Sequence, residues 1–153
     1  MKISSTGVTV DVPQGWEAEI YQREPERFEL LEAEASTGAV VHLGNFPLPP
    51  ERGDFGSGAV EIMKGDHVLV VLFEHGADSV GTRLFSATGM PQVTGTDFRP
   101  DRMQRPLPGQ SGAQYFFTIE GRPFCLYVAL GSHANRAEII PLVNETLATV
   151  TIA

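Results

Sequence analysis

The chain has 153 residues with 19 acidic and 11 basic side chains, which gives a formal net charge of −8. This charge argues against nucleic acid and against an anionic membrane surface as partners, because both recruit basic patches. Hydrophobic residues make up 42% of the chain, which excludes the disordered class. Residues 1–153 are long enough for one domain with its own core, so we expect a soluble single domain.

Three features bear on the compartment. The longest apolar runs, Val68–Phe73 and Phe124–Leu130, are far shorter than the roughly 20 residues of a membrane-spanning helix. Lys2 is not followed by the apolar stretch of a signal peptide. Cys125 is the only cysteine, so an internal disulfide and a paired-cysteine redox or zinc motif are excluded. These observations predict no membrane insertion and a cytoplasmic location.

Two hairpins are predicted in the first third of the chain. Apolar and polar residues alternate at 8–12 and at 16–20, with Pro13 and a Gln-Gly turn between the two runs. A second hairpin is predicted from residues 28–35 and 39–46, which are separated by a Ser-Thr-Gly turn.

The middle of the chain is irregular. Prolines at 47–50 and glycines at 53–58 precede a predicted short helix at Ala59–Lys64. The run Val68–Phe73 is apolar on both faces, which is typical of a central strand covered on both sides. Between Gly76 and Gly112 we expect one strand near Thr82–Ala87 and an ordered excursion from Gly89 to Gly109, because structureless loops of that length are uncommon.

A hairpin and a helix are predicted in the last third of the chain. Tyr115–Glu120 and Pro123–Gly131 form the hairpin. The terminal helix is predicted from an apolar stripe with steps of three, four and three: Ile140, Val143, Leu147 and Val150. Asn135 and Glu138 have the spacing of a capping box. Pro141 conflicts with that start, so either the helix kinks there or its regular part begins near it.

This order of elements predicts an α+β fold. Successive hairpins imply a mainly antiparallel sheet, with a short helix after the fourth strand and a long C-terminal helix packed on the sheet.

Each motif that might carry catalysis has a simpler structural interpretation. The glycines at 53, 56 and 58 lack the spacing of a dinucleotide or phosphate loop, which leaves a turn at a helix start that would at most hold an anion. His42, His75 and Glu74 would form a metal site only if the fold brought them together, and surface or core roles are the alternative. Cys125 lies in an apolar run, which favours core packing over nucleophilic catalysis. We predict no catalytic residue, no metal site and no cofactor, and leave open whether the protein is an enzyme.

A candidate binding surface comes from three arginines in an acidic chain, Arg99, Arg102 and Arg105. A helical turn would align them, and they would then bind an anion or an acidic partner. The alternative is that they pair with glutamates and hold the 76–112 segment to the body. Phe55 and Phe98 lie in loop-like sequence, and we include Phe55 in this candidate surface.

Short segments of the sequence resemble two groups of known proteins. The opening Gly7–Trp16, with the terminal helix, is similar to the Mog1/PsbP/LpqN-like proteins. The chain also resembles a family of actinobacterial and related bacterial proteins that has no assigned activity. The segments that carry this resemblance are 46–48, 56–60, 68–74, 121–124, 128–131 and 147–150. The first resemblance implies an antiparallel sheet flanked by helices and, for Mog1-like and PsbP-like members, docking onto protein partners. Neither supplies catalytic residues.

Three hypotheses for function remain. The first is a non-catalytic protein-interaction module with an unknown protein partner. The second is a small-molecule-binding protein or enzyme with a pocket between the sheet and the terminal helix. The third is a homo-oligomer whose doubly apolar strands lie at an interface.

Overall fold

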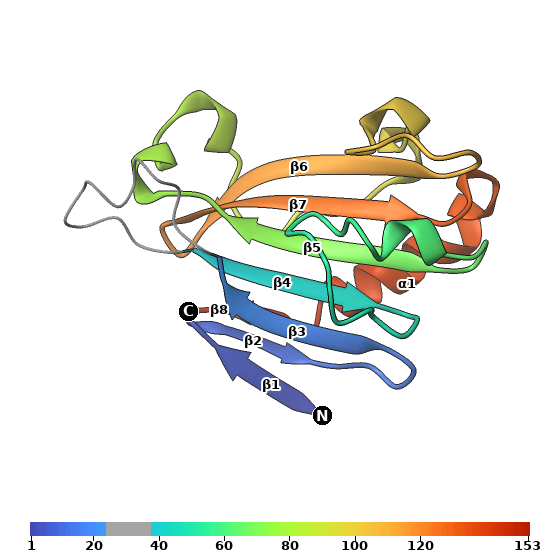
Figure 1. The fold of residues 1–153 in the computed structure, drawn as a ribbon. Helices are drawn as coiled ribbons and strands as arrows, with labels where there is room; N and C mark the ends of the chain where they lie inside the picture. Colours follow the sequence, from blue (N-terminus) through green and yellow to red (C-terminus); the bar gives the residue numbers. More distant parts are fainter. Residues whose placement is uncertain (24–37) are drawn as a thin grey trace.

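The computed structural model describes residues 1–23 and 38–153 of the chain. Its larger sheet has five antiparallel strands in the order β3-β4-β5-β7-β6 (Figure 1). The strands are β3 (Glu17–Gln22), β4 (Ala39–Gly44), β5 (Val68–Glu74), β6 (Ser111–Ile119) and β7 (Arg122–Leu130). The smaller sheet has the order β1-β2-β8, formed by β1 (Lys2–Ser5), β2 (Val8–Asp11) and β8 (Val150–Ile152).

Among the described residues the only α-helix is α1 (Arg136–Leu147), which crosses one face of the larger sheet (Figure 1). The α+β fold with antiparallel pairing is therefore confirmed. The helix begins at Arg136 with Pro141 inside it, so of the two alternatives at the proline, the one in which the regular helix begins there is wrong. Asn135 provides no side-chain cap, and the predicted capping box is not formed. Its amide nitrogen donates to the Gly65 carbonyl at 2.8 Å.

Both faces of the central strands are buried, as predicted for Val68–Phe73 and Phe124–Leu130. Alternate residues of β4, β5 and β7 face α1 and the smaller sheet, while the others face the segment that follows β4. The space between the sheet and α1 is filled by apolar side chains, including Val70, Leu126, Val128, Ile139 and Val143. The two doubly apolar strands are thus covered within this chain.

The first predicted hairpin is wrong. Residues 8–11 pair with β1 and β8, whereas residues 17–22 pair with β4 in the other sheet. The hairpin partner of β2 is β1, which precedes it directly in the sequence. Thr6 and Gly7 both adopt positive φ and form the two-residue turn between these strands. On its other side β2 pairs with β8, which contains Val150, so this residue belongs to a strand and not to the helical stripe.

Other differences concern the irregular middle. The helix predicted at Ala59–Lys64 is present only as a three-residue 3-10 helix, Val60–Ile62. The strand predicted near Thr82–Ala87 is also wrong, because this stretch contains the 3-10 helix Arg83–Phe85. The excursion from 89 to 109 is ordered around two further 3-10 turns, Gly95–Asp97 and Pro100–Arg102. The first strand predicted for the second hairpin, 28–35, lies outside the described residues.

The last hairpin is confirmed, and Arg122 at the start of β7 joins the two sheets. Its guanidinium donates twice to the Glu74 carboxylate, at 2.7 and 2.9 Å. It also donates to the carbonyls of Thr6 and Ala153, next to β1 and β8, at 2.9 and 3.1 Å. One side chain therefore links the larger sheet to both outer strands of the smaller one.

Candidate functional site

The edge strand β6 has a stretch of backbone with no partner. One side of β6 pairs with β7 along its whole length. On the other side, Gly112 exchanges two hydrogen bonds with Arg99, and Thr118 bonds to Ala87 and Gly89. Backbone groups alternate in direction along a strand, so those of Gln114 and Phe116 point the same way as those of Gly112 and Thr118. Within residues 1–23 and 38–153, nothing bonds to the N–H and C=O groups of Gln114 and Phe116.

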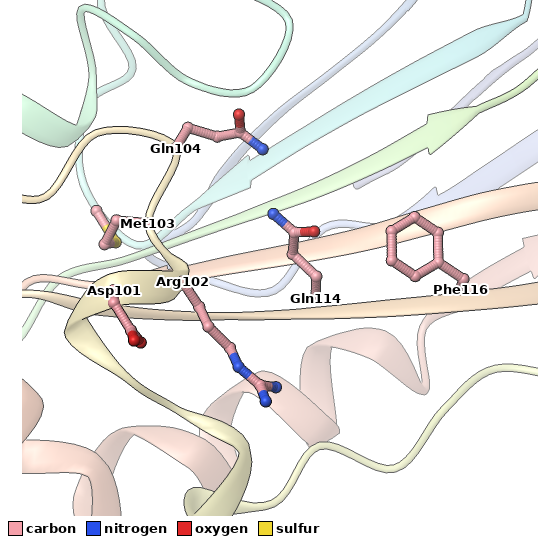
Figure 2. A pocket seen from close by; sticks show the side chains of 6 residues that line it. All are labelled: Asp101, Arg102, Met103, Gln104, Gln114 and Phe116. Atoms are coloured by element: carbon pink, nitrogen blue, oxygen red, sulfur yellow. The ribbon is translucent and has the colours of Figure 1, made fainter. Parts of the chain in front are cut away.

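A cavity of about 440 Å³ lies at this open stretch. Its lining comes from β6 and from the turn at 100–104, and comprises Asp101, Arg102, Met103, Gln104, Gln114 and Phe116 (Figure 2). In Figure 2 the side chains of Gln104, Gln114 and Phe116 lie to one side of the β6 ribbon, and Arg102 extends to the other side, toward α1. The cavity therefore borders the edge of the sheet from both of its faces.

The three arginines of the predicted surface do not converge. Arg99 is held by its backbone pairing with Gly112, and its guanidinium forms an ion pair with Asp101 at 2.9 Å. Arg102 lines the cavity, whereas Arg105 is exposed and takes no part in it. A helical turn at Asp101–Gln104 was needed to align the arginines, whereas the 3-10 helix spans Pro100–Arg102 and Met103 is already extended. Only one of the three arginines lines the cavity at the open edge.

Arg102 has no carboxylate partner among the described residues. Its Nη1 is 3.5 Å from the Asp97 carbonyl, the limit of a hydrogen bond. The Asp97 carboxylate is occupied by the Tyr115 hydroxyl at 2.6 Å and the Thr94 hydroxyl at 2.8 Å. These hydrogen bonds, with a smaller contribution from the Arg102 charge, hold the pKa of Asp97 below its usual range. Arg102 is thus a positive charge at the sheet edge that forms no direct ion pair among the described residues and is placed to meet an anion.

The aromatic residues of the predicted surface lie elsewhere. Phe55 is half-buried and stacks on Phe73, with ring centroids 4.9 Å apart, so it contributes to the core on the face opposite α1. Its ring also contacts Tyr127 edge-on, and the Tyr127 hydroxyl accepts the Gln104 N–H at 3.0 Å. Phe55 therefore supports the 103–104 turn only indirectly. Phe98 is 3% exposed, so its loop-like sequence was misleading.

The glycine stretch does not form an anion site. Gly56 and Gly58 have positive φ, as turns require, and a Cβ on Gly56 would come within 2.1 Å of the Leu69 side chain. The Gly58 N–H is already bonded to the Glu61 carboxylate at 2.6 Å. A single 3-10 turn follows, so no helix N-terminus of useful length faces solvent.

A second polar cluster, which sequence reasoning missed, surrounds His42. The fully buried ring accepts a hydrogen bond from Arg52 Nε at Nδ1 (2.9 Å) and donates from Nε2 to the Asp54 carbonyl (2.8 Å). Arg52 also donates to Glu19 and to the Pro49 carbonyl. Burial lowers the pKa of His42, and the Arg52 charge acts in the same direction. Both ring nitrogens are occupied, so the cluster fastens the segment after β4 to the sheet and leaves no free base.

The remaining candidates have structural roles. His75 lies against Phe73 and Phe85 and has no contact with His42. Across residues 1–23 and 38–153, no three His, Cys, Asp or Glu side chains are placed to hold a metal ion. Cys125 is buried as expected, and burial raises the pKa of its thiol to about 12.

A second cavity bears on the hypothesis of a pocket between the sheet and the terminal helix. It lies beside α1 and not between the helix and the sheet. Its volume is about 500 Å³, and its lining comes from the 94–96 turn and from helix residues that include Arg136, Ile140 and Pro141.

In the described part of the chain no helix is long and apolar enough to cross a membrane.

Comparison with known proteins adds nothing to this geometry. No protein-family model, curated protein or solved structure matches the chain. Any account of function must therefore come from the residues themselves.

The sequence identified Arg102 as a site residue but missed the β6 side chains beside it. Gln114 and Phe116 alternate with Tyr115 and Phe117, which signals a strand with two different faces. Nothing in that pattern reveals that β6 is an edge strand, since this depends on which strands pair in the folded sheet.

Proposed function

We propose that this protein is a non-catalytic interaction module that docks a protein partner on the open edge of β6 and the adjoining 100–104 turn. The single observation that carries the proposal is the unpaired backbone of Gln114 and Phe116 beside a cavity of about 440 Å³. An exposed strand edge is a template for pairing, and folds generally protect it with charges, prolines or covering segments. Among residues 1–23 and 38–153, partners cover the edge at both ends and leave it open between them.

Two candidate catalytic groups, the His42 ring and the Cys125 thiol, support a binding role because neither offers a free base or nucleophile. The His42 ring has both nitrogens bonded, and the Cys125 thiol is buried with a raised pKa. A general base or nucleophile needs a free atom within reach of a substrate. The Mog1/PsbP-like resemblance also implies protein docking, and stays a prediction.

Site-specific cross-linking tests the docking surface. A photoreactive benzoylphenylalanine at position 104 borders the cavity, and the same group at the exposed position 142 on α1 serves as the matched control. Illumination in cells of the source organism should give a discrete protein adduct at 104 that is absent at 142. The adduct should weaken when Arg102 is replaced by Glu. No adduct at 104, or identical adducts at both positions, contradicts the proposal.

A further inference from the structure

The geometry of the β6 edge also specifies what kind of partner segment it takes. We infer that the edge binds one extended peptide segment, which adds as a further strand beside Gln114 and Phe116 and places an acidic side chain against Arg102. This inference rests on the proposed docking function and gives its mode and chemistry.

The open stretch has the length of a short peptide. In the described part of the chain, the bridges at Gly112 and Thr118 leave Ala113–Phe117 uncovered, a span of about 17 Å at the usual rise of a strand. Two residues of an antiparallel partner, opposite Gln114 and Phe116, would each exchange two hydrogen bonds with them. Strand addition at an exposed edge uses main-chain bonds of this kind for affinity and side-chain pockets for specificity.

The two faces of the sheet differ in chemistry at β6, and this difference determines which side chains of the peptide would fit. Directly paired residues share a face of the sheet, so partner residues opposite Gln114 and Phe116 would meet Met103, Gln104 and the Phe116 ring, which are apolar or uncharged. The residue between them would lie opposite Tyr115, on the face to which Arg102 extends. An apolar–acidic–apolar alternation therefore fits the site.

Charge also discriminates between occupants. Arg102 has no carboxylate partner among the described residues, so a Glu or Asp from the peptide would neutralise it. A nucleic-acid strand is disfavoured by Asp101 at the cavity and by the net charge of −8.

A second copy of this chain is also disfavoured as occupant. It would bring another Arg102 to the same edge, and 3-10 turns stand at both ends of β6 (Figure 1). Those turns leave room for a single narrow strand and crowd a folded domain.

The test uses the full chain and defined peptides. A random heptapeptide library displayed on phage is selected against the immobilised protein, and the enriched peptides are synthesised and titrated by fluorescence anisotropy. We expect sequences with an acidic residue between two apolar ones. Arg102→Glu should weaken binding at least tenfold, whereas Arg105→Glu, a neighbouring exposed arginine outside the cavity, should change it less than twofold.

Amide hydrogen exchange tests the strand addition itself. Binding should slow exchange of the Gln114 and Phe116 amides, while the Ala113 and Tyr115 amides, which face β7, should change little. Gln114→Pro removes one outward N–H and should abolish binding; its folding is checked by circular dichroism. The exchange measurement on the unaltered chain decides the question if that variant does not fold.

The outcomes separate this inference from the proposed function. Peptides that bind without protecting these two amides, or without any acidic preference, overturn strand addition even if the cross-link at position 104 persists. Failure to enrich any peptide also overturns it. A dimer in analytical ultracentrifugation that dissociates in Arg102→Glu would assign the edge to a second copy. Loss of the cross-link as well would overturn both proposals.

Discussion

The substitution Arg122→Met should destabilise the protein strongly, because Arg122 joins the two sheets through four hydrogen bonds to Glu74, Thr6 and Ala153. Methionine keeps the length of the aliphatic part and removes the guanidinium. The Glu74 carboxylate would then keep its hydrogen bond from the Ala39 N–H at 3.0 Å and the weaker electrostatic contribution of Arg23. The variant therefore leaves a largely buried charge without the counter-ion that donates two hydrogen bonds to it.

The size of the effect follows from the burial of the pair. The Arg122 and Glu74 side chains are 18% and 16% exposed. A hydrogen bond to a charged group contributes roughly 1.5–3 kcal/mol, and unpairing a buried ion costs about 3–5 kcal/mol. Because some solvent reaches this pair, we expect a loss near the lower end, about 3 kcal/mol. In a protein of this size that corresponds to a fall in Tm of about 6–12 °C.

Urea unfolding followed by circular dichroism measures the loss. Arg105→Met is the matched control, since Arg105 is exposed and forms no ion pair among the described residues; surface changes of this kind stay within about 0.5 kcal/mol. Combining Arg122→Met with Glu74→Gln should recover part of the loss, because the double variant no longer contains an unpaired buried charge.

The pH dependence supplies an independent check of the same contact. Burial opposes ionisation of Glu74, but the bonds from Arg122 and the Ala39 N–H outweigh it and lower the pKa of the carboxyl. A lowered pKa means that the stabilisation is present above the unfolded value, about 4.3, and is lost as pH falls through the folded value. The difference between Arg122→Met and the parent should therefore shrink below about pH 4. A difference under 1 kcal/mol at pH 7, or one that stays constant to pH 3, would refute the reasoning.

Three further predictions concern buried groups. Burial lowers the pKa of His42 below that of an unfolded histidine, so stability should fall as pH drops below about 6.5. His42→Gln, whose amide can replace both hydrogen bonds, should flatten this slope in pH-dependent urea titrations and leave the part that His75 and His133 contribute. Burial of Cys125 should prevent reaction with a thiol reagent at pH 8 until the protein unfolds, and rapid labelling of the native protein would contradict the structure. Leu43→Ala should cost about 2–5 kcal/mol in the same unfolding assay, because Leu43 is fully buried between the sheet and the opposing elements; a loss below 1 kcal/mol would show that its surroundings collapse to fill the space.

The candidate site was predictable only in part. Arg102 was identified because three arginines are concentrated in one short stretch of an acidic sequence, and this observation depends on residue type and order alone. Its separation from Arg99 and Arg105 depends on how the Pro100–Arg102 turn meets β6, which no spacing encodes. Phe55 and Phe98 show the converse error, because turn-rich sequence predicts exposure while both rings pack against the sheet.

Local pattern alone determined the elements whose signal lies within a few neighbouring residues. Val68–Phe73 and Phe124–Leu130 are apolar at every position and became central strands, and Glu120-Gly121 supplied the two positive φ angles that close the last hairpin. Tertiary structure decided what depends on distant partners. The run at 8–11 pairs with β8 from the other end of the chain and not with its neighbour at 17–22, because β8 and the turn at Thr6 occupy both of its edges. The open edge of β6 arises in the same way. β6 pairs with β7 on one side, and whether another strand pairs on its other side depends on the whole sheet order and not on the local pattern.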